Sequence, residues 1–240
     1  MFIEADLHCH SLASSHAYST VKELAASAKE NGLKMFALTD HAASMEDAPH
    51  PWHFTNLSVI PREVCGVRVL RGVEANLRNI DGEIDMSDFE LGFVEWVVVS
   101  CHDPLIVPGT AEENTLAYIN LMKRYEAVDL IGHPTTKRYP VDFDKLAKAA
   151  KEYGKFLELN ESSLQFWRSP AENCLAMLDA CKKYGTQIIV NTDCHFCDII
   201  GKTPTTQKML EETNFPKELI FNLREENVIE YLAKKKNIII

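Results

Sequence analysis

The sequence lacks the long apolar runs of a membrane protein. A membrane-spanning helix needs about 20 consecutive apolar residues, and no run in this 240-residue chain approaches that length. The first residues contain no basic region ahead of an apolar one, unlike a secretory signal peptide. The seven cysteines are an odd number at scattered positions, which disfavours a disulfide framework. These absences favour a protein of the reducing cytoplasm without a membrane partner.

Strong positive charge is also absent. The formal net charge is −10, and the one basic cluster is the lysine run at 234–236. Cations suit the last turn of a helix, so we interpret this run as a solvated helix end. Nucleic-acid binding usually requires a basic stripe that neutralises phosphates. We therefore expect no strong nucleic-acid binding, whereas a small phosphorylated metabolite is compatible with this charge. The sequence leaves the oligomeric state open, a homo-oligomer included.

Short apolar runs alternate with amphipathic segments along the chain. We predict strands at residues 3–7, 35–38, 67–73, 97–99, 130–131, 156–159 and 187–190, with 219–222 as a weak extra strand. We predict helices at residues 21–31, 111–127, 142–153, 171–184, 205–212 and 225–236. This alternation indicates parallel strands joined by right-handed crossovers. The prediction is one α/β domain over residues 1–240, a closed or nearly closed barrel of seven strands.

Histidines and carboxylates recur where these strands end. Six of the nine histidines follow or finish a predicted strand, and so do two carboxylates: His8, His10, His41, His102, His133, His195, Glu74 and Asp193. The carboxyl ends of parallel barrel strands meet at one mouth. Imidazole and carboxylate ligands suit Zn²⁺, Mn²⁺ or Fe²⁺. The sequence therefore predicts a multinuclear metal site at the carboxyl end of the barrel.

Spacing adds detail to this prediction. His8 and His10 stand at i and i+2, so both side chains project from one face of an extended strand, and Asp193 and His195 repeat the pattern. Asp6 shares that face with His8, and we predict that it orients the imidazole. Glu74 is the only acidic candidate in the middle of the chain, and it is the natural bridge between two metals.

Other residues are candidates on weaker grounds. His16 lies in the loop 11–19 and could complete a three-histidine site with His41 and His195. His50 and His53 lie in the long loop 42–56, where they are solvated or face the substrate. The loop 76–90 is a second rim or lid candidate. Three cations after later strands are phosphate contacts or plain surface charges: Lys137, Arg138 and Arg168. Cys194 and Cys197 form a CxxC without a second pair, a weak zinc or redox signal.

The order of these motifs resembles the PHP (polymerase and histidinol phosphatase) superfamily, and its stand-alone YcdX-type phosphatases in particular. That family carries HxH, TDH, a strand-end Glu, an isolated His, an HP pair and DxH. The same series stands here at residues 8–10, 39–41, 74, 102, 133–134 and 193–195, over essentially the whole chain. Residues 16–20, 45–50 and 81–85 resemble that branch as well.

The resemblance implies a distorted (β/α)7 TIM-like barrel that holds three divalent metals, usually zinc. One metal would use His8, His10, Glu74 and Asp193. A second would use Glu74, His102 and His133, and a third His16, His41 and His195. The implied activity is hydrolysis of a small phosphate monoester by a metal-bridging hydroxide held through Glu74 and Asp193. The sequence itself identifies no general acid; a metal-bound water and a histidine of the loop 42–56 are two alternatives.

Three other functions stay open at this point. A phosphodiesterase or 3′–5′ exonuclease would use the same ligands, but the acidic charge counts against it. A non-catalytic zinc-binding protein would release its metal readily to a mild chelator. An amidohydrolase also presents HxH on its first strand, commonly with a bridging lysine, and no lysine stands at a predicted strand end.

Overall fold

Seven parallel strands form the centre of the fold. The computed structural model describes residues 3–240, and its eight strands are β1 (Ala5–Cys9), β2 (Met35–Leu38), β3 (Glu63–Val64), β4 (Val67–Asn76), β5 (Trp96–Ser100), β6 (Leu130–Ile131), β7 (Phe156–Asn160) and β8 (Ile188–Asn191). They pair in the order β1-β2-β4-β5-β6-β7-β8, all parallel, and the two-residue β3 pairs antiparallel with β4. The predicted α/β barrel with seven parallel strands is confirmed.

The barrel is nearly closed between β8 and β1. Cys9 and Cys194 form a single parallel bridge there, and the His10 amide donates to the Cys194 carbonyl at 2.9 Å. Farther down, the side chain of Asn222 fills the gap. Its amide nitrogen donates to the Ala5 and Val190 carbonyls, both at 2.6 Å, and its oxygen accepts from the Val190 amide. A side-chain amide thus provides hydrogen bonds that another strand would otherwise make.

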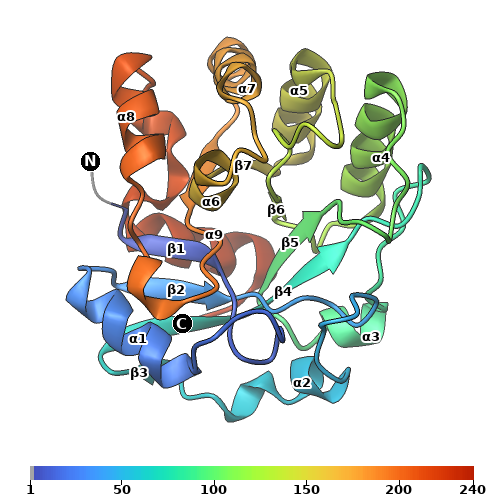
Figure 1. The fold of residues 1–240 in the computed structure, drawn as a ribbon. Coiled ribbons are helices and arrows are strands. Elements are labelled where there is room, and N and C mark those ends of the chain that lie inside the picture. The colour runs from blue at the N-terminus through green and yellow to red at the C-terminus, as the bar shows by residue number, and fades with distance from the viewer. Residues whose placement is uncertain (1–2) are drawn as a thin grey trace.

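Helices cover the outside of the sheet (Figure 1). They are α1 (Val21–Glu30), α2 (Trp52–Thr55), α3 (Asp88–Leu91), α4 (Ala111–Arg124), α5 (Phe143–Tyr153), α6 (Glu161–Gln165), α7 (Ala171–Tyr184), α8 (Pro204–Glu212) and α9 (Glu225–Lys236). Local signals set their ends. Thr20 and Glu23 form a capping box at α1, while Gly154 and Gly185 end α5 and α7 in the left-handed conformation. No helix within residues 3–240 is both long and apolar enough to cross a membrane.

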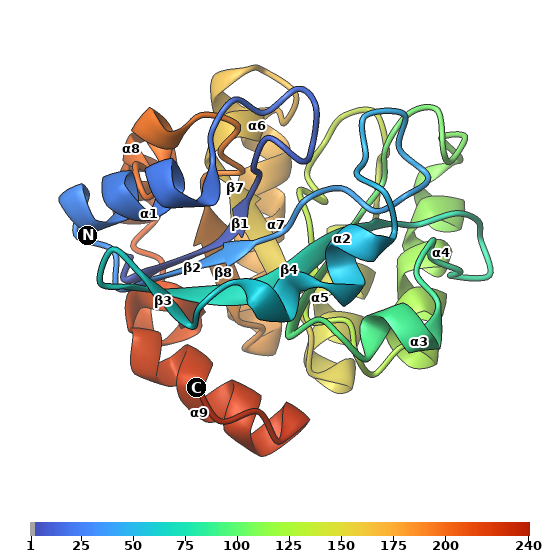
Figure 2. The ribbon, with the colours of Figure 1, turned by 90° about the horizontal axis from the view of Figure 1, so that it is seen from below.

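Two apolar layers hold the barrel together. The outer layer lies between strands and helices, and it includes Val73, Leu121 and Leu178. The inner layer fills the barrel, and α9 adds Val228 and Leu232 to it. Helix α9 lies behind the strands in Figure 1, and the turned view of Figure 2 places it at one end of the barrel. The inner layer and α9 therefore close that end, and the polar loops gather at the other.

Strand β1 is irregular, and the irregularity changes which side chains face inward. Its pairing with β2 shifts register between Asp6 and Cys9. Ala5 and Leu7 pack in the inner layer, whereas Cys9 packs in the outer one. The extra residue of such a bulge breaks the regular alternation of side chains, so His8 also faces the inside of the barrel although it directly follows Leu7.

Two regions differ in detail from the sequence predictions. The weak strand at 219–222 is wrong: the chain there forms short 3₁₀ turns at Lys217–Leu219 and Phe221–Leu223, with one bridge from Ile220 to Ile188. The backbone carbonyl of Asn222 accepts from the Glu4 amide at 3.1 Å, just before β1, and its side chain makes the hydrogen bonds to β1 and β8. The long loops contain short helices, because α2 lies within residues 42–56 and α3 begins near the end of residues 76–90.

Candidate metal centre

Glu74 lies at the centre of a ring of imidazoles. Strand β4 carries it into the mouth of the barrel, where it is 1% exposed. Its carboxylate oxygens lie 3.0 to 3.5 Å from ring nitrogens of five histidines: His8 at 3.2 Å, His10 at 3.5 Å, His41 at 3.0 Å, His102 at 3.5 Å and His133 at 3.1 Å. The Ser100 hydroxyl donates to the same carboxylate at 2.5 Å. One buried carboxylate is thus shared by five strand-end histidines.

Asp193 is a second buried carboxylate in the cluster, in addition to Glu74. Its carboxylate lies 3.3 Å from His10 Nε2 and 3.7 Å from His8 Nε2. Arg168 places a guanidinium nitrogen 3.2 Å from its other oxygen. Asp193 has a backbone φ of 53°, and His133 has one of 28°. Non-glycine residues rarely adopt positive φ, and such strain concentrates at functional sites.

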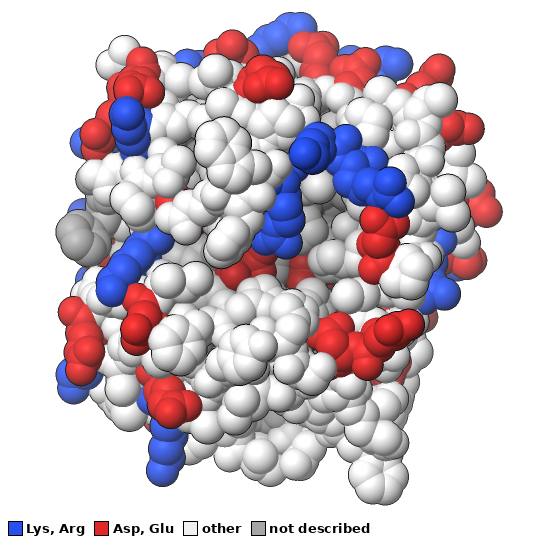
Figure 3. All heavy atoms as spheres, viewed as in Figure 1, with Lys and Arg blue, Asp and Glu red and all other residues white. Residues whose placement is uncertain are grey.

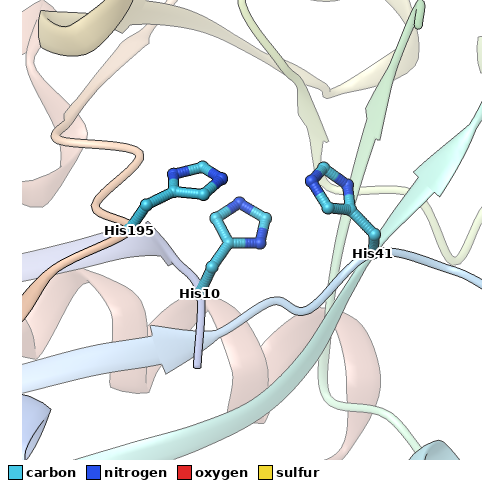
Figure 4. Close-up of side chains that lie close together, drawn as sticks. All are labelled: His10, His41 and His195. Carbon is cyan, nitrogen blue, oxygen red and sulfur yellow. The ribbon is translucent and has the colours of Figure 1, made fainter. Parts of the chain in front are cut away.

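His16 and His195 extend the cluster from the histidines that surround Glu74. His10, His41 and His195 gather from β1, β2 and β8 (Figure 4). The ring centroids of His10 and His195 lie 4.3 Å apart, and those of His16 and His195 lie 4.4 Å apart. Candidate ligand atoms within 4.8 Å of one another form four overlapping groups: His10–His41–His195, His8–His10–Asp193, His16–His41–Asp47 and His41–Glu74–His102.

Most of these imidazoles are fixed through one ring nitrogen. His8 Nδ1 donates to Glu158 at 2.8 Å, and His102 Nδ1 donates to the Asn76 side-chain oxygen at 2.7 Å. His16 Nδ1 donates to Asp47 at 2.6 Å. A metal-binding histidine typically donates its second ring N–H to a carboxylate or carbonyl in this way. The tautomer that results leaves Nε2 as a lone-pair donor.

Buried ring nitrogens without a hydrogen-bond partner indicate that the cluster can bind metal ions. Within residues 3–240, four buried nitrogens of the cluster have no hydrogen-bond partner: His8 Nε2, His10 Nε2, His41 Nδ1 and His195 Nε2. Buried polar atoms without a partner are costly and rare in folded proteins. Divalent ions bound to these nitrogens would satisfy them, so the residues present fit the group that the sequence predicts.

The electrostatics of the cluster favour a bound cation. Burial alone would raise the pKa of Glu74, but the surrounding imidazoles, His8 foremost, hold it well below its usual value. Burial lowers the pKa of His10 to about 4 and that of His102 to about 3. These groups therefore favour a carboxylate and neutral imidazoles near pH 7, which are the forms that bind metal. Although burial opposes it, three carboxylates raise the pKa of His8, a sign of local negative potential.

Several residues around the cluster were missed at the sequence level. Glu158, at the middle of β7, accepts from His8 Nδ1 and from the His133 amide at 2.7 Å. A charged residue inside the apolar run 156–159 was the signal that could have revealed it. Asp47 lies in the loop 42–56, and Asn76 is the last residue of β4. The sequence does not indicate which histidine either side chain would contact.

The role predicted for Asp6 is wrong. Its carboxylate accepts from the Thr192 amide at 3.2 Å and hydroxyl and from the Gly201 amide at 3.0 Å, and no described contact joins it to the His8 ring by a hydrogen bond. The register shift in β1 is the reason, because it turns His8 inward while Asp6 stays on the outer side. Glu158 orients His8 instead.

The predicted substrate residues lie in different surroundings. Lys137 and Arg168 are joined by a backbone hydrogen bond of 3.0 Å, and Arg168 contacts Asp193. Arg138 pairs with Asp103 at 2.7 Å on the exposed rim. Figure 3 shows Lys and Arg along one side of the central hollow, with Asp and Glu atoms near its floor.

The two loop histidines differ from each other. His53 Nε2 lies 3.2 Å from Asp40, and its side chain is 23% exposed. Asp40 in turn accepts from Ser11 and Ser14, so His53 belongs to the network that supports the loop after β1. His50 is exposed and packs edge-on against Trp52. The structure brings His53 close to the cluster and leaves His50 at the rim.

A parallel barrel with histidines and carboxylates gathered at its carboxyl end defines a class of metal-binding barrels. The family model described as PHP domain matches residues 6–162, more than half of the chain. The chain therefore belongs to the PHP domain family, as its motifs predict.

Relatives match nearly the whole chain. A "Probable phosphatase" of Acetivibrio thermocellus is 44% identical over 231 residues, which is 96% of this chain and 95% of that protein. A "Probable phosphatase" of Caldicellulosiruptor saccharolyticus is 40% identical over 232 residues and covers 97% of each chain. The solved structure of histidinol phosphate phosphatase from Lactococcus lactis, complexed with zinc, L-histidinol and phosphate, has a TM-score of 0.63 at 16% identity. It covers 91% of this chain and 94% of its own. At this level of identity, the similarity to the Lactococcus lactis structure shows the fold alone.

Proposed function

We propose that this protein is a metal-dependent phosphatase that hydrolyses a small phosphate monoester. The observation that carries the proposal is the Glu74 carboxylate, buried and within 3.5 Å of five imidazoles. A buried carboxylate that so many ring nitrogens surround is arranged for shared metal ligation. The names of the relatives that match the whole chain support the same activity.

The proposed centre holds three divalent ions, zinc first, with manganese or iron as alternatives. His8, His10, Glu74 and Asp193 would hold one ion. Glu74, His102 and His133 would hold the second, and His16, His41 and His195 the third. The groups His8–His10–Asp193 and His10–His41–His195 in the structure support the first and third assignments in part. When bound, such ions lower the pKa of a water and offset the charge of the phosphoryl group.

The residues of the chain itself have three tasks in this proposal. Glu74 and Asp193 are the proposed catalytic carboxylates, because they would hold the ions that activate the attacking water. Arg168 reaches the site beside Asp193 and is the first candidate to bind a phosphate oxygen. Lys137 lies next to Arg168, because its backbone amide donates to the Arg168 carbonyl. Arg138 pairs with Asp103, and this ion pair must break before Arg138 can contact a substrate. His53 and His50, both within residues 42–56, are weaker candidates for substrate contact.

Initial rates with two model esters test the proposal. The protein is purified without chelator, supplemented with Zn²⁺ or Mn²⁺, and assayed with 4-nitrophenyl phosphate and with bis(4-nitrophenyl) phosphate. We expect the monoester to dominate. Dominant diester turnover would transfer the proposal to a phosphodiesterase. Full metal loading without turnover of either ester would favour a zinc-binding protein or an amidohydrolase.

The Glu74→Gln variant isolates the carboxylate. Glutamine keeps the shape and removes the charge that two ions would share, so we expect fewer bound ions by elemental analysis and at least about a 100-fold loss of kcat/KM, the scale of a lost metal-site group. Glu30→Gln, an exposed change on α1, is the matched control and should alter neither. Unchanged metal content and turnover in Glu74→Gln would contradict the proposal.

A further inference from the structure

A short hairpin in the loop after β4 returns the chain to the end of that strand. Leu77 and Ile84 form an antiparallel bridge within it. Gly82 makes the turn with a φ of 78°, and a Cβ at this position would lie 2.2 Å from a backbone nitrogen of α4. Glycine is the residue that meets both conditions. Asp85, which directly follows the hairpin, therefore lies beside Asn76, the last residue of β4.

The Asp85 side chain is half-buried, and its carboxylate accepts three hydrogen bonds. The Asn76 backbone amide donates to one oxygen at 2.7 Å. The Asn76 side-chain nitrogen donates to the other oxygen at 2.7 Å, and the Ser44 amide donates to that oxygen at 3.2 Å. Because a carboxylate only accepts hydrogen bonds, it holds the nitrogen end of the Asn76 side chain toward itself. The oxygen end of that side chain is therefore directed away from Asp85.

The oxygen end of the Asn76 side chain contacts the His102 ring. Asn76 Oδ1 lies 2.7 Å from His102 Nδ1. A carbonyl oxygen only accepts, so the neutral ring carries its proton on Nδ1 and keeps the lone pair of Nε2 for a metal. The Glu74 carboxylate opposes this tautomer, because it lies 3.5 Å from Nε2 and would accept a proton placed there. The contact with Asn76 is much the shorter, so it decides the tautomer.

We propose that Asp85 is a positioning residue of the metal centre, which orients the Asn76 amide and thereby fixes the ring and the tautomer of His102. The proposal rests on the proposed function, because His102 is a ligand of the second proposed ion. Within residues 3–240, no hydrogen bond joins Asp85 to a proposed ligand, so it acts through Asn76. The motif at residues 81–85 thus has a role, in which Gly82 makes the turn and Asp85 makes the contact.

Two variants test the proposal on the zinc-free chain. In Asp85→Ala, the Asn76 amide is free to present either end to the ring, and Glu74 then draws the proton to Nε2. In the double variant Asn76→Asp with Asp85→Ala, a carboxylate faces the ring and accepts from Nδ1 without any partner to orient it. Nitrogen NMR of histidine-labelled protein distinguishes the two tautomers, and His102→Gln identifies the signal. We expect the proton on Nδ1 in the wild type, on Nε2 in Asp85→Ala, and on Nδ1 again in the double variant.

Zinc affinity, measured by competition with a chromogenic chelator, is the second readout. Asp85→Ala should weaken it about 10- to 100-fold, the scale for a residue behind a ligating histidine, and the double variant should recover it. A role confined to supporting the loop would not be recovered, because the double variant lacks the Asp85 carboxylate as well. Asp81→Ala, at an exposed position of the same loop, is the matched control and should change neither readout.

A proton on His102 Nε2 in the wild type would overturn the proposal, and this result needs no variant. An unchanged tautomer or an unchanged zinc affinity in Asp85→Ala would overturn it too, as would a loss that the double variant does not recover. The spectra require neither zinc nor turnover. If they follow the expected pattern while no ester is hydrolysed, only the proposed function fails. Hydrolysis of the monoester with the same tautomer in Asp85→Ala as in the wild type would remove this proposal and leave the phosphatase standing.

Discussion

At the scale of single residues, the site depends on pairs formed across the barrel. Glu158 of β7 accepts from His8 of β1, and its other oxygen accepts from the His133 amide after β6. Asn191 and Asn160 donate to the same carboxylate at 2.8 and 3.0 Å. The position of the Glu158 carboxylate therefore fixes the His8 ring directly and the backbone of His133.

We predict that Glu158→Gln weakens zinc binding about 10- to 100-fold, as is typical when a partner behind a ligating histidine is changed. The physical reason is that a neutral amide holds the His8 ring less firmly and no longer stabilises partial positive charge on it. Zinc affinity measured by competition with a chromogenic chelator checks this. Glu218→Gln, an exposed change, should leave the affinity as it is. Wild-type affinity in Glu158→Gln would show that His8 needs no such partner.

The residues that gather at the candidate metal centre could largely be predicted from the sequence, whereas the residues that support them could not. His8, Glu74 and Asp193 each stand at the end of a strand that their own neighbours define, so a local pattern was enough. The pairing of Glu158 with His8 joins residues 150 positions apart, and no local pattern reports it. The error for Asp6 has the same origin, because regular alternation is a local assumption and the register shift in β1 breaks it.

At the scale of elements, α9 holds the closed end of the barrel. Val228 and Leu232 are fully buried and pack with the inner layer that also contains Trp96 and Phe156. Tyr231 of the same helix donates to Asp129 at 2.8 Å. The helix could be predicted from the sequence over the same residues, but its place could not, because the amphipathic pattern gives the buried face without naming what covers it.

We predict that Leu232→Ala destabilises the protein by about 2–5 kcal/mol, because it leaves a cavity in a packed layer. Urea unfolding followed by circular dichroism measures the change. Leu116→Ala, the same substitution at a helix position that is 44% exposed, should cost far less. A loss of similar size in both variants would mean that α9 packs more loosely than these contacts indicate.

At the scale of the whole molecule, the site and the fold depend on each other. The candidate ligands extend from His8 to His195 and come from six of the seven parallel strands or the loops that follow them. Metal bound only by the folded chain stabilises it by mass action, by about 2.7 kcal/mol at 100 times the Kd. We further propose that residues 1–240 unfold as one domain.

We predict a single thermal transition whose midpoint rises when zinc is added and falls when a chelator removes it. Tryptophan fluorescence and circular dichroism should report the same midpoint, as expected for one cooperative unit. Calcium, which prefers oxygen ligands, should leave the midpoint where it is and serves as the control ion. Two separate transitions would contradict the single domain, and a midpoint indifferent to zinc would contradict the metal centre.

The register shift in β1 has a consequence for how this chain can vary over evolutionary time. Leu7 supports the inner layer and His8 the metal centre, although they are consecutive residues. A substitution at either position affects one task, but an insertion or deletion between Asp6 and Cys9 would exchange the tasks of both and send an imidazole into the apolar floor. We therefore expect natural variants to differ in the composition of this strand and to keep its length, while gains and losses of residues collect in the loop 42–56.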